Sequence, residues 1–113
     1  MKIFGIGIDS IEIRRLRTIL RKKEDRFILD TFTKIEREYC FSYRDAAPHF
    51  AGTFAAKEAV QKAADDPRPL QKIEIRRKKN GKPEVWLNKK RSKSFLVSIT
   101  HNESIASAIA LRQ

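Results

Sequence analysis

The spacing of hydrophobic positions predicts one strand followed by three helices in the first part of the chain. Residues 2–9 alternate with the period of two that a strand requires. Hydrophobic positions then recur at helical spacing, and the predicted helices cover Ser10 to Lys23, Thr33 to about Tyr43, and residues 49–64. Asp9 followed by Glu12 resembles a capping box at the first helix start, and Thr33 followed by Glu36 resembles one at the second.

Strand patterns dominate the remainder of the chain. Residues 71–79 and 83–88 flank Asn80-Gly81, the strongest short signal for a hairpin. Pro67 and Pro69 end the alanine-rich helix, and two more strands are predicted at 95–100 and 104–112 around a short connection. A strand, then helices, then a run of strands predicts an α+β fold with a mostly antiparallel sheet and helices packed on one face.

Composition sets broad limits on function. The 113 residues suffice for one domain, residues 1–113, without room for a second core. The formal net charge is +11, so the surface attracts polyanions: nucleic acid, an anionic membrane, a phosphate-bearing cofactor or an acidic protein. The single cysteine, Cys40, precludes an internal disulfide and favours the reducing cytoplasm. No apolar run is long enough to predict a signal peptide or a membrane span.

The first candidate for chemistry is Asp9, at the end of the strand. With a period of two, Gly5, Gly7 and Asp9 point to one face, so that face is cleared of side chains up to the carboxylate. A helix cap is one interpretation of Asp9. The glycines favour a second, because they allow another backbone or a ligand to approach the strand closely. The same glycines match only part of a dinucleotide-binding fingerprint.

The second candidate is a row of residues on the alanine-rich helix. Phe54, Glu58 and Lys62 lie four apart and share one helix face, which mixes an apolar group with both charges. An exposed ion pair between Glu58 and Lys62 would need no function. If Asp9 meets Glu58 in space, the two carboxylates would suit Mg²⁺, and Lys62 would meet a phosphate.

Two further groups complete the candidates. His101 lies in a predicted turn with serine and acid nearby, but no nucleophile-elbow pattern supports a hydrolytic triad. Arg14, Arg17 and Arg21 fall on one arc of the first helix and Arg26 follows, which makes a plausible docking surface. The basic run 88–93 is most simply a loop, and the motifs of RNA recognition, zinc binding and helix-turn-helix proteins do not occur in the sequence.

These pieces, in this order, resemble the holo-acyl-carrier-protein synthase family, the small type of 4′-phosphopantetheinyl transferase. The resemblance covers nearly the whole chain. It is carried by GIGIDSIEI (5–13), RFILDTFTKIEREYC (26–40), FAGTFAAKEAVQKA (50–63), IEIRRKKNGKP (73–83) and VSITHNESIASAIA (97–110). The first and third stretches are the specific motifs, and each would be weak without the other.

The resemblance implies a function and a reaction. Asp9 and Glu58 would hold Mg²⁺, which binds the pyrophosphate of coenzyme A, and Lys62 would lie near the transferred phosphoryl group. A serine hydroxyl of apo-acyl carrier protein would attack the phosphate that bears the pantetheine, giving holo-acyl carrier protein and adenosine 3′,5′-bisphosphate. Either Glu58 or a water or hydroxide on the metal would remove the serine proton.

The resemblance also implies partners. The protein would be a homotrimer with each site between neighbouring subunits. The nucleotide part of coenzyme A would be contacted from the adjacent chain by Gly81, Lys82, Pro83 and His101. The acidic recognition helix of the carrier protein would bind Arg14, Arg21 and Arg26. Neither nucleic acid nor a membrane span is expected.

The sequence departs from the family at three places. Thr53 stands where the family usually has an arginine, which removes one expected phosphate contact. The loop after Lys62-Ala63 is shorter and acidic, and Asn102 replaces a more usual serine or threonine. Two alternatives therefore stay open. One is a degenerate relative that binds coenzyme A or a carrier protein without catalysis. The other is a small basic nucleic-acid-binding module, whose binding would weaken steeply with salt.

Overall fold

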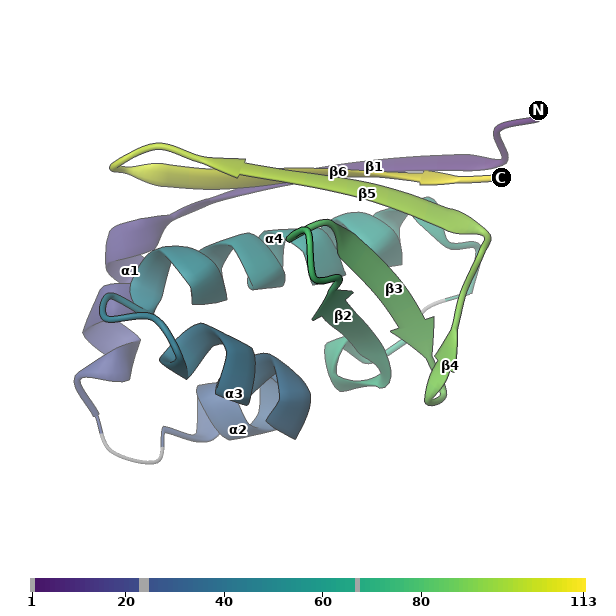
Figure 1. The fold of residues 1–113 in the computed structure, drawn as a ribbon. Coiled ribbons are helices and arrows are strands. Elements are labelled where there is room, and N and C mark those ends of the chain that lie inside the picture. The colour runs from purple at the N-terminus through teal and green to yellow at the C-terminus, as the bar shows by residue number, and fades with distance from the viewer. Residues whose placement is uncertain (1, 23–24, 67) are drawn as a thin grey trace.

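The structure is a computed structural model that describes residues 2–22, 25–66 and 68–113. Its elements alternate from strand to helices to strands along the chain (Figure 1). They are β1 Gly5–Glu12, α1 Ile13–Leu20, α2 Arg26–Thr31, α3 Lys34–Phe41, α4 Ala47–Ala63, the 3₁₀ helix η1 Leu70–Lys72, β2 Ile73–Arg77, β3 Pro83–Leu87, β4 Lys90–Arg91, β5 Phe95–His101 and β6 Ile105–Arg112.

The strands form two antiparallel sheets, so the predicted α+β class is confirmed with its strands divided in two. The first sheet has the order β1-β6-β5, and the second has the order β2-β3-β4. In the first sheet Asp9 lies opposite Ala108 of β6, which in turn lies opposite Ile99 of β5. Figure 1 shows the first sheet as a layer above α4, with the β2–β3 hairpin in front of the helix.

Helix α4 is the centre of the core, and its small side chains explain how closely the sheet approaches it. Ala51, Ala55 and Ala59 are all fully buried. A Cβ built at Gly5 would overlap the Ala63 carbonyl oxygen, and one at Gly7 would overlap the Ala59 carbonyl oxygen. The backbone of α4 therefore fills the space beside the two glycines, which answers the question that the sequence left between a ligand and a neighbouring backbone.

The start of α1 differs from the prediction, whereas the start of α3 confirms it. Asp9 lies inside β1, and the N-cap of α1 is Glu12, whose side chain caps nothing. The interpretation of Asp9 as the cap of the first helix is therefore wrong. The reason is that the β1–β6 ladder continues as far as Glu12. At α3, Thr33 N donates to Glu36 Oε1 at 2.9 Å and Glu36 N donates to Thr33 Oγ1 at 3.2 Å, which is the predicted capping box.

Other boundaries follow the sequence closely. The helix predicted at 49–64 is α4, and the Asn80-Gly81 turn closes the β2–β3 hairpin, with Gly81 at φ 88°. Helix α2, capped by Asp25, was not predicted, and strand β4 forms inside the run 88–93 that was expected to be a loop. The predicted helix end at Lys23 and the break at Pro67 lie outside the described residues.

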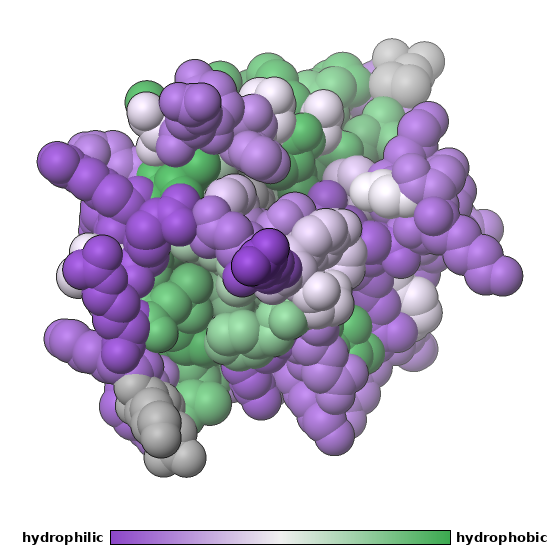
Figure 2. Space-filling model, turned by 60° about the vertical axis from the view of Figure 1, so that its left-hand side comes forward, coloured by the Kyte–Doolittle hydropathy of each residue, from purple (hydrophilic) through white to green (hydrophobic). Residues whose placement is uncertain are grey.

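The face of the first sheet opposite α4 is apolar and exposed. Ile6 is 62% exposed and Ile8 is 64% exposed on β1. Leu96, Ile105 and Ile109 continue this apolar surface on β5 and β6. No described element covers it in Figure 1, and hydrophobic residues follow the upper margin of the molecule in Figure 2. We call this surface the outer sheet face. Within the described parts of the chain, no helix has the length and apolar character to cross a membrane.

Candidate active site

Asp9 is positioned by β1 on the side of the first sheet that packs against α4. It follows Gly5 and Gly7 at the strand period, so all three residues face the helix. Its side chain is 18% exposed, which leaves the carboxylate partly accessible at the margin between sheet and helix. The close glycine packing therefore brings the Asp9 carboxylate next to α4.

Glu58 and Lys62 reach the same place from α4. They lie one turn apart on the helix. The ammonium of Lys62 donates to the Ile8 carbonyl oxygen at 2.9 Å and lies 3.3 Å from Asp9 Oδ1. Strand β1 and helix α4 are thus joined through Lys62 beside Asp9.

The Glu58 carboxyl lies within the electrostatic influence of Asp9. Burial raises the pKa of the Glu58 carboxyl, and the negative charge of Asp9 raises this pKa further, while Lys62 opposes the shift. The charge of Asp9 disfavours the charged form of Glu58, and a bound cation would relieve this repulsion.

The donor set fits magnesium. Among the residues that the structure describes, no group of three or more His, Cys, Asp or Glu side chains could hold a metal ion. A cation bound here would have Asp9 and Glu58 as its protein ligands and would complete its shell with water and phosphate oxygens. Mg²⁺ is commonly bound in this way, through one or two carboxylates plus substrate phosphates.

Three of the four predicted nucleotide-binding residues lie beside a groove of about 660 Å³ between the β2–β3 hairpin and β5. Its lining includes Gly81, Lys82, Pro83 and the basic side chains of Arg77, Lys78 and Arg91. The volume falls within the range of about 300–1,000 Å³ that is typical of small-molecule sites. An elongated anionic ligand would find both space and positive charge there.

His101 lies beyond this groove, at the end of β5. The last β5 residue of the groove is Ile99, and His101 is exposed. The His101 ring centroid is 6.1 Å from that of His49, whose ring stacks on Tyr43 at 3.5 Å. Burial, with help from the charges of His101 and Arg77, lowers the pKa of His49. This aromatic cluster was not predicted, because no motif marks His49.

The hairpin groove and the Asp9 group lie at opposite edges of the first sheet. Asp9 is on the edge strand β1, and the groove borders the edge strand β5, with β6 between them. Two strand spacings amount to about 10 Å. Figure 1 shows the same arrangement, with β1 at the back of the sheet and the hairpin at the front. One chain therefore keeps the predicted metal ligands apart from the predicted nucleotide contacts.

The predicted docking arginines form an exposed surface on α1 and α2. Arg14 is 83% exposed beside Glu12, and Arg26 is 82% exposed beside Asp30. Arg21 is also exposed, at the end of α1. Arg14 and Arg21 are exposed because the buried side of α1 carries Ile13 and Leu16.

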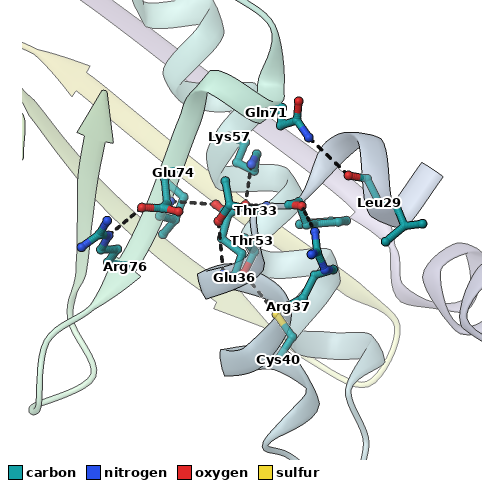
Figure 3. A network of polar contacts seen from close by, with 12 residues as sticks. Leu29, Thr33, Glu36, Arg37, Cys40, Thr53, Lys57, Gln71, Glu74 and Arg76 are labelled. Carbon is teal, nitrogen blue, oxygen red and sulfur yellow. Dashed lines mark hydrogen bonds and ion pairs between the residues drawn. The ribbon is translucent and has the colours of Figure 1, made fainter. Parts of the chain in front are cut away.

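Sequence reasoning missed a buried ion pair next to the candidate site. Lys57 and Glu36 are both fully buried and joined to each other (Figure 3). A lysine among the alanines of α4 was the available signal, but it lies off the helix row that carries Phe54, Glu58 and Lys62. Thr53 is buried too, with its hydroxyl 3.7 Å from Cys40 Sγ, so it offers no exposed phosphate contact.

The profile of the 4′-phosphopantetheinyl transferase superfamily matches residues 5–110, so the chain belongs to this superfamily. Within it, the relatives are holo-[acyl-carrier-protein] synthases. The protein of Thermodesulfovibrio yellowstonii is 36% identical over 96% of this chain and 97% of its own length. That of Chlamydia trachomatis serovar L2 is 38% identical over 98% of this chain and 100% of its own length.

The solved structures agree with the sequence relatives. A holo-(acyl-carrier-protein) synthase from Bacillus anthracis, in complex with CoA (3′,5′-ADP), matches with a TM-score of 0.82 and 31% identity. The match covers 97% of this chain and 96% of that chain. The predicted family and the prediction of an enzyme of the phosphopantetheinyl transferase type are therefore confirmed.

Proposed function

We propose that this chain transfers 4′-phosphopantetheine from coenzyme A to a serine of apo-acyl carrier protein in a Mg²⁺-dependent reaction. The products are holo-acyl carrier protein and adenosine 3′,5′-bisphosphate. The observation that carries this proposal is the meeting of Asp9 from β1 with Glu58 and Lys62 from α4. The relatives support it, because they are holo-[acyl-carrier-protein] synthases over nearly their full length.

The side chains of this site suit phosphoryl transfer, which needs mainly positioning and charge neutralisation. Asp9 and Glu58 would hold the metal, which would neutralise the charge of the pyrophosphate. Lys62 is more than half exposed, and its ammonium group faces the transferred phosphoryl group. Glu58 would also be a candidate base for the proton of the serine hydroxyl.

The nucleotide part of coenzyme A binds in the groove beside the hairpin. Arg77, Lys82 and Arg91 line this groove and would pair with phosphate oxygens. His101 lies outside the groove, at the end of β5, and would contact the nucleotide from there. The Bacillus anthracis synthase was solved with CoA (3′,5′-ADP), which supports the same ligand class here.

Acyl carrier protein, an acidic partner, docks on the exposed arginines Arg14, Arg21 and Arg26. The net charge of +11 steers such a partner to the surface, and the steering weakens with salt. A cytoplasmic location, which the single free cysteine favours, belongs to the same proposal.

The protein assembles as a homotrimer with each site shared between two copies. Two features support this arrangement. The outer sheet face exposes large aliphatic side chains that a second copy would bury. The metal ligands and the hairpin groove stand at opposite edges of one sheet, so a neighbouring copy can bring one half-site to the other.

The test is transfer to a carrier protein measured by mass spectrometry. The protein is incubated with coenzyme A, Mg²⁺ and apo-acyl carrier protein, and the carrier should gain the mass of one phosphopantetheine. Asp9→Ala and Glu58→Ala should each nearly abolish the gain, as should removal of the metal with EDTA. Absence of the gain, under conditions that serve a known synthase, would refute the proposed reaction. Binding of coenzyme A without transfer would instead identify a degenerate relative.

A further inference from the structure

The ion pair between Glu36 and Lys57 lies in the core and touches none of the groups assigned to substrates. Both side chains are 0% exposed, and the Lys57 ammonium donates to Glu36 Oε1 at 2.5 Å. Lys57 directly precedes Glu58, and the two side chains leave α4 about 100° apart around its axis. The lysine faces inward, and the glutamate faces the candidate site.

Glu36 joins three elements through one carboxylate (Figure 3). Oε1 accepts the bond from Lys57 of α4 and a second bond from Thr33 N at the start of α3. Oε2 accepts from Ile75 N of β2 at 2.7 Å. Because β2 leads into the hairpin that borders the groove, Glu36 connects the helix that carries Glu58 to the strand that carries the hairpin.

Stability alone is a poor reason for such a pair. Removing two charges from water has a large cost, and apolar replacements of buried ion pairs are often as stable or more stable. What the pair adds beyond stability is a fixed geometry. A short charged contact holds the backbones of α3 and α4 in one relative position more narrowly than apolar packing does. On the sheet side of α4, the backbone contacts at Gly5 and Gly7 fix the helix in the same way.

We propose that Glu36 and Lys57 are positioning residues for the transfer reaction. Their contact sets the rotation and the axial position of α4 between the two sheets, and this determines where Glu58 stands relative to Asp9. The inference rests on the proposed function for the role of Glu58. The part of the inference that concerns structure alone is the position of α4.

The test begins with Lys57→Met, which keeps a side chain of similar length and leaves Glu36 its two backbone donors. We expect Mn²⁺, used as a probe for Mg²⁺ and measured by calorimetry, to bind about 10- to 100-fold more weakly, which is the usual loss when a residue that orients a metal ligand is removed. The value of kcat should fall by a similar factor, while KM for the carrier protein stays unchanged. The matched control is Glu38→Gln, which removes an exposed carboxylate from the same helix α3 and should change none of these quantities.

A second variant keeps the proposal testable if Lys57→Met leaves a buried charge that prevents folding. Glu36→Gln with Lys57→Met removes both charges and should fold, yet it should bind Mn²⁺ as weakly as the single variant. Folded variants with parental Mn²⁺ affinity and kcat would overturn the proposal, as would failure of both variants to fold, which would assign the pair to stability.

One measurement separates this inference from the proposed function. If the parent chain transfers no phosphopantetheine, the proposed function fails. A crystal structure of the folded variant then decides the positioning role, because it needs neither metal nor activity. The Lys62–Asp9 contact of 3.3 Å should be broken in the variant, and its retention would overturn the inference.

Discussion

Replacing Gly7 with alanine would place a methyl group where the backbone of α4 now lies. The added Cβ would overlap the carbonyl group of Ala59 and would lie 3.0 Å from Ala63 N. All of these atoms belong to main chain inside a helix, so none can rotate away. Relief requires that β1 and α4 move apart.

The expected cost follows from overpacking of a rigid core. Such substitutions destabilise by about 1–3 kcal/mol, and rigid backbone on the other side of the contact places Gly7→Ala at the upper end. For a domain of this size each kcal/mol lowers the Tm by about 4 °C. The separation of β1 and α4 also moves Asp9 away from Glu58. We therefore expect the transfer rate of the folded variant to fall by about 10²-fold.

The assay pairs thermal unfolding with the rate of carrier-protein modification, both at fixed protein concentration because assembly would shift the Tm. The matched control is Gly52→Ala. A Cβ at Gly52 would meet a methyl group of the Ile99 side chain at 3.0 Å rather than helix backbone, and alanine favours the helix by about 1 kcal/mol. Gly52→Ala should keep both Tm and rate. A parental Tm and rate for Gly7→Ala would refute the reasoning, because it would mean that α4 does not occupy the glycine face.

Three other outcomes can be measured. Ile8→Glu, which charges the outer sheet face, should dissociate the assembly to monomers in analytical ultracentrifugation, whereas Lys34→Glu on α3 should not; an unchanged mass would exclude this face as the interface. Asp9→Ala and Lys82→Ala chains, each inactive or weakened alone, should regain transfer when refolded together, because mixed assemblies contain some sites with both halves intact; no gain would place each site within one chain. Burial raises the pKa of the Cys40 thiol from 9.0 to about 12, so its contribution to stability is full below pH 9 and is lost as the pH rises toward 12. Urea unfolding at pH 8 and pH 10.5 should show this loss in the parent and not in Cys40→Ala.

Local signals predicted local structure, and long-range pairing overrode them in one place. The Thr33–Glu36 capping box formed as expected because both partners lie within one helical turn. The similar signal at Asp9 failed because β1 pairs with β6, whose Ser107 bonds to Ser10 across 97 positions of sequence. No window on the sequence around Asp9 contains that partner. The short helix α2 was missed because it offers a single cap, Asp25, and few turns of hydrophobic spacing.

The part of the candidate site that depends on side-chain periodicity could be predicted from the sequence. The helix row placed Glu58 and Lys62 on one face, and the strand period placed Asp9 on the glycine face, so their meeting required one packing assumption. The position of the hairpin at the opposite edge of the sheet depends on strand order, which the sequence does not encode locally. The Glu36–Lys57 pair joins residues 21 positions apart on different helices, and nothing in their local patterns links them.

The two specific motifs of the sequence are two sides of one packing contact. The glycines of β1 admit the backbone of α4 at Ala59 and Ala63, and the small side chains of these alanines are themselves buried. At that separation Asp9, next along the strand period, meets the charged side chains that precede each alanine, Glu58 and Lys62. A larger residue at either glycine would lift the strand and part the carboxylates. The spacing Gly-x-Gly-x-Asp is therefore needed to keep the proposed metal ligands at their distance from each other. The glycines affect the chemistry through this distance, without touching a ligand.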